Sequence, residues 1–236
     1  MAHGESTTDG WSAAPQRWSA PTIALHWLSA ALILVLLGLG WFMVHGDIDA
    51  GTKFDLYQLH KSLGFLSLAL LLLRLAARFA KASPQFPAAM PDWERRLAGL
   101  THVTFYLLLL IAALSGWLLV SAAIIAIPTR FFDLFVIPNL VGADAALQAN
   151  MTFLHYVVSR LLIVLVALHM AAALKHHFLD RDDILRRMFG VREDAVPGRT
   201  PPISAQAAVD DQALFGDHRA VVGSQKQRRP GDFVGQ

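Results

Sequence analysis

Two histidines, His155 and His169, lie fourteen residues apart in one apolar stretch, MTFLHYVVSRLLIVLVALHMAAALKHHF. Fourteen residues of α-helix make about four turns, so both imidazoles are expected on the same face. Along the helix axis they lie roughly 21 Å apart, most of the way across the hydrocarbon core of a bilayer. An imidazole in lipid is costly unless something binds it. The pair therefore predicts two stacked cofactor sites, one near each membrane surface.

Each of these histidines has a candidate partner at its own depth on another apolar segment. His26 matches His169 near the inner surface, and His60 matches His155 near the outer surface. Two neutral imidazoles that face each other are suitable axial ligands for a six-coordinate b-type haem. The alternative is that each histidine bonds a neighbouring helix or a backbone carbonyl. A zinc site is disfavoured, because the apolar segments bring no carboxylates or thiolates close to these histidines.

Five other residues in the apolar segments have open roles. Arg160, His102 and Lys61 are candidates for contacts with a haem propionate or a quinone, although Arg160 could instead extend to the surface and His102 could bind water. For Arg74, anchoring of its helix end at the inner surface is favoured over a role in a site. Gly64, one turn after His60, would let either a porphyrin or another helix approach closely.

The composition is that of a membrane protein. Of 236 residues 55% are hydrophobic and only 16% are charged, whereas soluble domains carry about a quarter charged residues. There is no cysteine, which excludes disulfides, iron–sulfur clusters and covalently attached c-type haem. Any haem must be held non-covalently.

Four segments are long and apolar enough to span a bilayer. The expected helices cover about residues 21–44, 57–80, 97–125 and 152–179. Since their backbones must be satisfied internally, they predict an all-α, four-helix transmembrane bundle. We expect a polar N-terminal segment at 1–20 without a removable signal peptide, a cytochrome-like domain at 21–190, and a disordered tail at 191–236.

The distribution of basic residues predicts the orientation of the bundle. The connection between the second and third segments and the region after the fourth are rich in arginine, whereas each of the other two connections holds one basic residue. By the positive-inside rule, both termini should face the cytoplasm. The chain is thus predicted to be a multi-pass protein of the bacterial inner membrane.

Four motifs in this order resemble the bacterial cytochrome b561 family: IALHW, LHKSLGF, LTHVTFYLLL and LHYV…ALHMAAALKHHF. The resemblance runs from about Arg17 to Gly190. It implies two b haems in a four-helix bundle, with axial ligands His26, His60, His155 and His169. Members of the family move electrons across the membrane to or from the quinone pool, and at least one resembles a superoxide oxidase that reduces ubiquinone.

The electron donor is left open by the sequence. The outer loops are acidic, with Asp47, Asp49, Asp55, Asp133 and Asp144 against Lys53 and Arg130, which disfavours steering of anionic superoxide. We therefore expect a dihaem cytochrome that passes electrons between a periplasmic donor, superoxide or a redox partner, and membrane ubiquinone. One alternative is a cytochrome b subunit of a hydrogenase- or formate dehydrogenase-like complex. The other is a histidine-containing proton or metal transporter.

Overall fold

The computed structural model describes residues 18–80, 90–125, 127–182 and 184–190. Most of the polar N-terminal segment and the whole tail predicted at 191–236 lie outside these residues. The residues described belong to one compact unit that ends at Val191.

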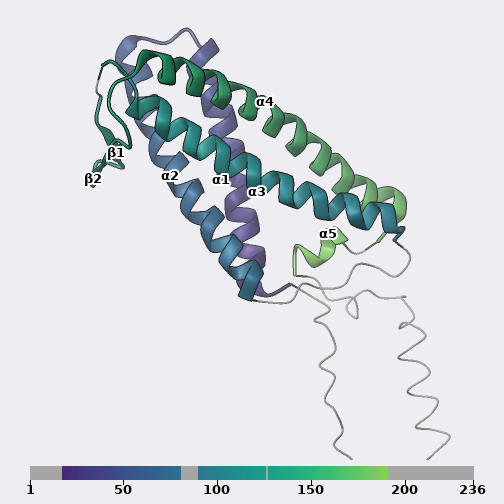
Figure 1. Cartoon of the computed structure of the whole chain (residues 1–236). Helices are drawn as coiled ribbons and strands as arrows, with labels where there is room; N and C mark the ends of the chain where they lie inside the picture. Colours follow the sequence, from purple (N-terminus) through teal and green to yellow (C-terminus); the bar gives the residue numbers. More distant parts are fainter. Residues whose placement is uncertain (1–17, 81–89, 126, 183, 191–236) are drawn as a thin grey trace, which may run out of the picture. The chain divides into compact units, whose positions relative to one another are not determined.

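The structure contains the four expected helices, all long and apolar enough to cross a membrane. They are α1 (Ala20–His45), α2 (Ala50–Ala80), α3 (Asp92–Ser121) and α4 (Ala145–Lys175). Helix α1 packs against α2 and α3 packs against α4, and contacts between α2 and α3 join these two hairpins (Figure 1). The predicted four-helix bundle is confirmed.

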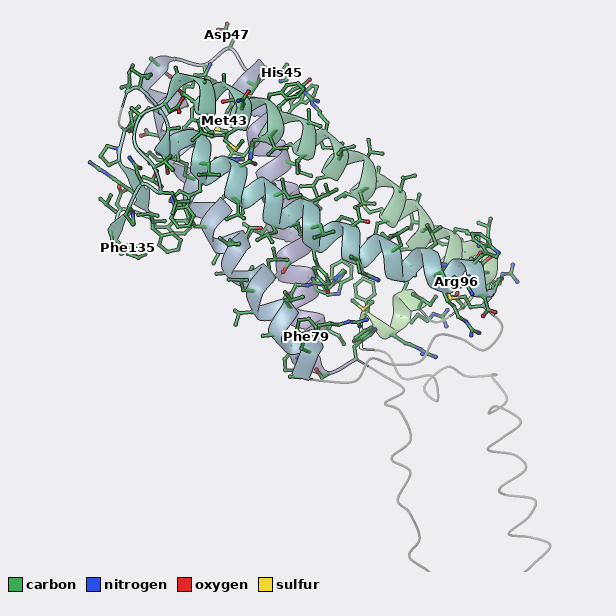
Figure 2. All side chains as sticks on the ribbon, in the orientation of Figure 1. Met43, His45, Asp47, Phe79, Arg96 and Phe135 are labelled. Carbon is green, nitrogen blue, oxygen red and sulfur yellow. The ribbon has the colours of Figure 1, made fainter. Side chains whose placement is uncertain are left out.

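The two ends of the bundle are distinct. Figure 2 places His45 and Asp47 at one end, and Phe79 and Arg96 at the other. We call the first the hairpin end, because a short β-hairpin follows α3 there, and the second the basic end, because arginines gather in the helix ends and connections there. Between the ends, large apolar side chains such as Leu73, Val164 and Leu168 are more than half exposed, as expected of a surface that faces lipid.

The helices begin earlier than predicted where aspartates cap them. Helix α2 starts at Ala50 because the Asp49 carboxylate accepts bonds from the backbone N–H groups of Gly51 and Thr52, at 2.9 and 3.0 Å. The Thr52 hydroxyl donates to the other carboxylate oxygen at 2.6 Å. These bonds lower the pKa of Asp49, and the bond from the Thr52 side chain contributes most. Capping of this kind extends an apolar helix into its polar flank.

Helices α3 and α4 show similar shifts. Helix α3 runs from Asp92 to Ser121 rather than over 97–125. Helix α4 begins at Ala145 rather than at 152, since the Asp144 side chain accepts from the N–H groups of Ala146 and Leu147. At its far end α4 continues as a π-turn, His176–Asp180, and a short helix α5, Ile184–Arg187, follows.

One element was not expected in an all-α protein. Strands β1 (Thr129–Phe131) and β2 (Phe135–Ile137) form an antiparallel hairpin in the connection between α3 and α4, with Phe131 opposite Phe135. Phe132 and Asp133, in the turn between the strands, have positive φ angles of 46° and 58°. Each strand has only three residues, so the alternation of side chains that marks a β-strand is too short to be distinguished from a loop in the sequence.

Replacing Asp144 with alanine should destabilise the protein by about 1 kcal/mol, because two N–H groups of the first turn of α4 lose their acceptor. Unfolding in detergent, followed by circular dichroism, measures the effect. Asp47→Ala is the matched control, since this exposed aspartate lies in the loop before α2 and caps no helix. Equal stability of the two variants would contradict the capping assignment.

Candidate haem-binding site

The outer pair predicted from the sequence meets across the bundle near the hairpin end. The ring centroids of His60, on α2, and His155, on α4, are 6.3 Å apart. Both side chains are partly buried. The Nδ1 atom of His60 is buried and has no hydrogen-bond partner in the part of the chain that the structure describes.

The imidazole of His155 is held by the neighbouring helix α3. Its Nδ1 lies 2.9 Å from the carbonyl oxygen of Ala112 and 3.3 Å from the hydroxyl of Ser115. Because a carbonyl only accepts, Nδ1 carries the proton and the Nε2 lone pair stays free. This is the arrangement that orients a histidine as a metal ligand.

Two glycines leave room for the imidazoles of this pair. A Cβ added at Gly116 would lie 3.2 Å from Cε1 of His155 and 3.3 Å from its Nδ1, and one at Gly40 would lie 3.5 Å from Cε1 of His60. Any larger residue at Gly116 would therefore press on the ring of His155. A Cβ at Gly64 would meet open space, so this glycine serves no close helix contact among the described residues.

A second group of rings lies nearer the basic end. The centroids of His26, on α1, and His169, on α4, are 6.4 Å apart. Two residues of α3 extend the group: His102 lies 5.9 Å and Phe105 5.4 Å from His169, centroid to centroid. Three imidazoles from three helices therefore converge on this site.

Arg74, on α2, takes part in the same site. Its Nη1 donates to Nδ1 of His26 at 3.2 Å and lies 3.5 Å from the carbonyl oxygen of Leu25. Anchoring at the surface, the interpretation favoured for Arg74, is wrong, since the guanidinium bonds His26 within the bundle. Because Arg only donates, Nδ1 of His26 is the acceptor, and the proton of the neutral ring is on Nε2.

The histidine pairs fit the requirements of bis-imidazole ligation. When two imidazoles face each other across one metal ion, bonds of about 2 Å place their centroids about 6 Å apart. Both observed separations agree with this value. The free Nε2 of His155 and the glycine beside its ring add to the fit at the hairpin end. At the basic end, ligation through Nε2 of His26 requires Arg74 to release Nδ1, which must then carry the proton.

The other two predicted site residues differ in their surroundings. The guanidinium carbon of Arg160 lies 4.8 Å from the ring centroid of Trp41 and 4.9 Å from that of Tyr156. Its charge is thus balanced by cation–π contacts that link α1 to α4. Lys61 follows the candidate ligand His60, and its ammonium makes no hydrogen bond or ion pair with any residue that the structure describes.

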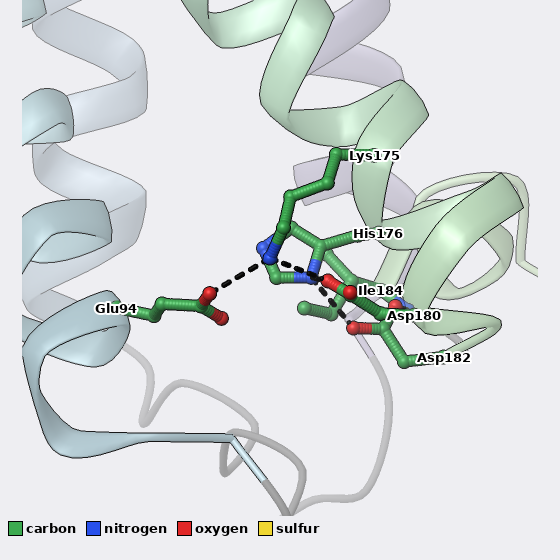
Figure 3. Close-up of polar contacts among 6 residues, drawn as sticks. All are labelled: Glu94, Lys175, His176, Asp180, Asp182 and Ile184. Atoms are coloured by element: carbon green, nitrogen blue, oxygen red, sulfur yellow. Dashed lines mark hydrogen bonds and ion pairs between the residues drawn. The ribbon is translucent and has the colours of Figure 1, made fainter.

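An ion-pair network ties α3 to α4 at the basic end (Figure 3). The ammonium of Lys175 lies 2.7 Å from Glu94 and 2.8 Å from Asp180. His176 Nδ1 lies 3.0 Å from Asp180 and 2.8 Å from Asp182. Glu94, His176 and Asp180 could together ligate a metal ion, but the Lys175 ammonium already supplies the cation there.

The chain after this network returns to α1. The indole N–H of Trp27 donates to the carbonyl oxygen of Met188 at 2.7 Å, and its ring stacks on Phe189 with centroids 4.7 Å apart. We call the segment around α5, residues 184–190, the strap. Trp27 follows His26 directly, so the strap ends beside the histidine pair of the basic end, and Figure 1 shows α5 between α1 and the ends of α3 and α4.

Sequence reasoning paired the four histidines as the structure brings them together, but it missed their supports. Ser115, Gly116 and Phe105 of α3 resemble ordinary residues of an apolar helix, and only folding places them against imidazoles. For Arg74 a signal existed, since a cation within a span calls for a partner.

Comparisons with known proteins identify the family of this chain. The family model described as prokaryotic cytochrome b561 matches residues 17–191. The chain is 34% identical over 177 residues to cytochrome b561 homolog 2 of Escherichia coli K12, covering 75% of this chain and 93% of that protein. It is 25% identical to cytochrome b561 homolog 1 of the same strain, over 75% and 99% of the two chains. It is 24% identical to the probable superoxide oxidase CybB of Yersinia pestis, over 73% and 96%.

The residues that the family model matches, 17–191, span the whole helical bundle and the positions of all four paired histidines. The chain therefore belongs to the prokaryotic cytochrome b561 family, and is a multi-pass protein of the bacterial inner membrane that uses b-type haem in electron transfer.

Proposed function

We propose that the chain is a dihaem cytochrome that passes single electrons between a donor on the periplasmic side and the ubiquinone pool. His60 and His155 would hold one haem, and His26 and His169 the other. The observation that carries this proposal is the presence of two facing histidine pairs, one toward each end of the bundle and both sharing α4. Bound there, haem supplies a reversible one-electron couple whose potential depends on its ligands and burial.

The protein's own residues prepare the two sites differently. His155 is already oriented by the Ala112 carbonyl, with Nε2 available. His26 is held by Arg74 in the opposite tautomer, so loading this site moves the guanidinium. Once released, Arg74 is a nearby cation for an anionic group such as a haem propionate. The imidazole of His102 also lies beside His169, and it would contact a propionate or the quinone.

The orientation of the bundle is part of the proposal. Arginines gather in the helix ends and connections at the basic end, whereas residues 45–56 and 126–151 at the hairpin end carry one lysine and one arginine. The positive-inside rule then places the basic end in the cytoplasm and the pair His60/His155 toward the periplasm. Arg160 would stay within its aromatic stack, and Lys61 would supply a positive charge beside the periplasmic site.

The charge of the hairpin end favours a basic donor protein over superoxide. Its loops hold five aspartates against two basic residues. Asp49 and Asp144 cap helices as carboxylates, and Asp133 lies 3.4 Å from Arg130, but the surface stays acidic. An acidic surface repels an anion and attracts a basic partner. Stopped-flow mixing of superoxide with the oxidised protein, from which reduced quinone has been removed, separates the two donors. Rapid haem reduction would favour superoxide despite this charge.

The strap supports an acceptor that arrives through lipid. It crosses the basic end from the network at Lys175 to Trp27, beside the pair His26/His169. A soluble acceptor in the cytoplasm would have to pass this cover, whereas a quinone reaches the site laterally within the bilayer. The alternative of a subunit in a hydrogenase- or formate dehydrogenase-like complex predicts a stable complex on purification.

Alanine at either member of a pair should remove one of two haems, because a six-coordinate site loses an axial ligand. Pyridine haemochrome assays should give about half the wild-type haem for His60→Ala and His155→Ala, with one set of spectral bands lost. His26→Ala and His169→Ala should lose the other set. His45→Ala, which replaces an exposed histidine, is the control and should keep both. Loss of the same bands in His60→Ala and His26→Ala would refute the pairing.

Gly116→Ala should weaken the site at the hairpin end, since its Cβ would crowd the His155 ring at 3.2 Å. We expect loss of the bands that disappear in His155→Ala, measured in reduced-minus-oxidised spectra. Gly38→Ala is the matched control: a Cβ at this α1 glycine meets nothing within 4 Å, and the exchange should leave the spectrum unchanged. A normal spectrum for both variants would show that His155 has more room than the structure gives it.

Trp27→Ala should open the basic end to soluble oxidants, because the strap loses both its hydrogen bond and its stacked ring. In inverted membrane vesicles, membrane-impermeant ferricyanide should oxidise the reduced haem near His26 about tenfold faster than in the parent. A tenfold change in rate corresponds to about 1.4 kcal/mol in the activation free energy. Trp93→Ala, an exposed tryptophan of the same end, should behave like the parent. Faster oxidation only in right-side-out vesicles would contradict the orientation, and unchanged rates would contradict the strap's role.

A further inference from the structure

The β1–β2 hairpin is fastened to the side of α2. Gln58 donates to the carbonyl oxygen of Pro128 at 3.1 Å. One turn further along α2, the Ser62 hydroxyl donates to the carbonyl oxygen of Arg130 at 2.9 Å and accepts from the N–H of Phe132 at 3.0 Å. From Pro128 to Phe132 the chain therefore runs alongside α2, in the direction that leads away from the hairpin end of the bundle. Figure 1 likewise shows both strands beside α2.

These contacts give the depth of the hairpin. From the start of α2 at Ala50, Gln58 lies roughly 12 Å and Ser62 roughly 18 Å along the axis. Helix α2 has 31 residues and is about 46 Å long, so a centred helix extends about 8 Å beyond each side of a 30 Å hydrocarbon core. The levels of Gln58 and Ser62 are then about 4 and 10 Å inside the boundary, the range of depth to which interfacial segments insert their apolar side. A loop docked there cannot lie wholly in water.

The side chains at the turn are apolar and turned outward. The exposed fractions of Leu134, Phe135 and Val136 are 77%, 57% and 58%, and Figure 2 shows Phe135 pointing away from the helices. Phe131 lies behind them, with its ring 5.1 Å from that of Phe135. Such a cluster is unfavourable in water and favourable in lipid.

The polar groups limit how deep the hairpin can lie. The ion pair between Arg130 and Asp133 is exposed, and the outer edge of a two-stranded sheet has unpaired backbone groups. Neither is tolerated in the hydrocarbon centre, but hydrated headgroups satisfy both. The polar and apolar sides together match the boundary between headgroups and acyl chains.

We propose that the hairpin, residues 129–137, is an interfacial membrane anchor whose exposed side chains insert into the adjacent bilayer leaflet. The bilayer is the occupant that this surface fits, because Leu134, Phe135 and Val136 are exposed at a level that lies within the bilayer. The anchor is joined through Ser62 to the helix that carries His60. Lipid contact would thereby hold the hairpin beside the histidine pair of this end, whichever way the protein is oriented.

The absence of native cysteine allows single spin labels to test the anchor. Leu134→Cys carries the label in the full-length protein in liposomes, and power saturation compares collisions with oxygen, which partitions into lipid, and with a water-soluble nickel chelate. The control positions are Asp47→Cys in the loop before α2, and Val164→Cys on the exposed surface of α4. Normal haem absorbance shows that each labelled protein is folded.

A label at Leu134 should resemble the one at Val164, with the ratio of oxygen to nickel accessibility about tenfold above that at Asp47. A ratio equal to that at Asp47 would overturn the anchor. Low accessibility to both reagents would also overturn it, and spin–spin broadening that disappears on dilution with unlabelled protein would identify a second copy as the occupant.

Ser62→Ala provides an independent readout, because it removes the hydrogen bonds from α2 to Arg130 and Phe132. The label at Leu134 should become more mobile, and its accessibility ratio should fall toward that at Asp47 by about threefold or more. Ser29→Ala is the matched control, since among the described residues this buried serine bonds only the Leu25 carbonyl of its own helix. An unchanged label in Ser62→Ala would show that lipid contact does not depend on docking to α2.

Discussion

The structure depends on keeping neutral imidazoles inside a lipid-facing bundle. Each costs free energy unless a partner from another helix satisfies it. His155 meets this condition through the Ala112 carbonyl on α3, and His26 through Arg74 on α2. The partners lie across helix interfaces, so packing and ligand geometry are coupled. A shift of one helix would disturb both the bundle and the sites.

Helix α4 has a special position in this arrangement. It provides one histidine to each pair, which fixes the distance between the two sites along one rigid element. Contacts with α3 and the Lys175 network hold α4 in register, and the Arg160 stack links it to Trp41 of α1. The two histidine pairs thereby keep a constant separation.

The two ends of the bundle are closed by different physical means. At the basic end, ion pairs and one indole hydrogen bond hold the strap near His26. At the hairpin end, backbone and hydroxyl groups dock β1 to α2 while apolar side chains face outward. One end limits access from water, and the other adapts the protein to lipid. Both closures are made by segments that carry none of the four paired histidines.

The sequence by itself determined the class, the four spans and the pairing of His26, His60, His155 and His169, because helical periodicity and bilayer thickness relate residue number to depth. It misplaced helix starts, since the caps at Asp49 and Asp144 act through local hydrogen bonds that hydropathy does not register. Only the tertiary structure decided that Arg74 bonds His26, that Gly116 clears the His155 ring, and that the hairpin lies against Ser62. These contacts join residues distant in the chain, and their types alone do not indicate which partner they meet.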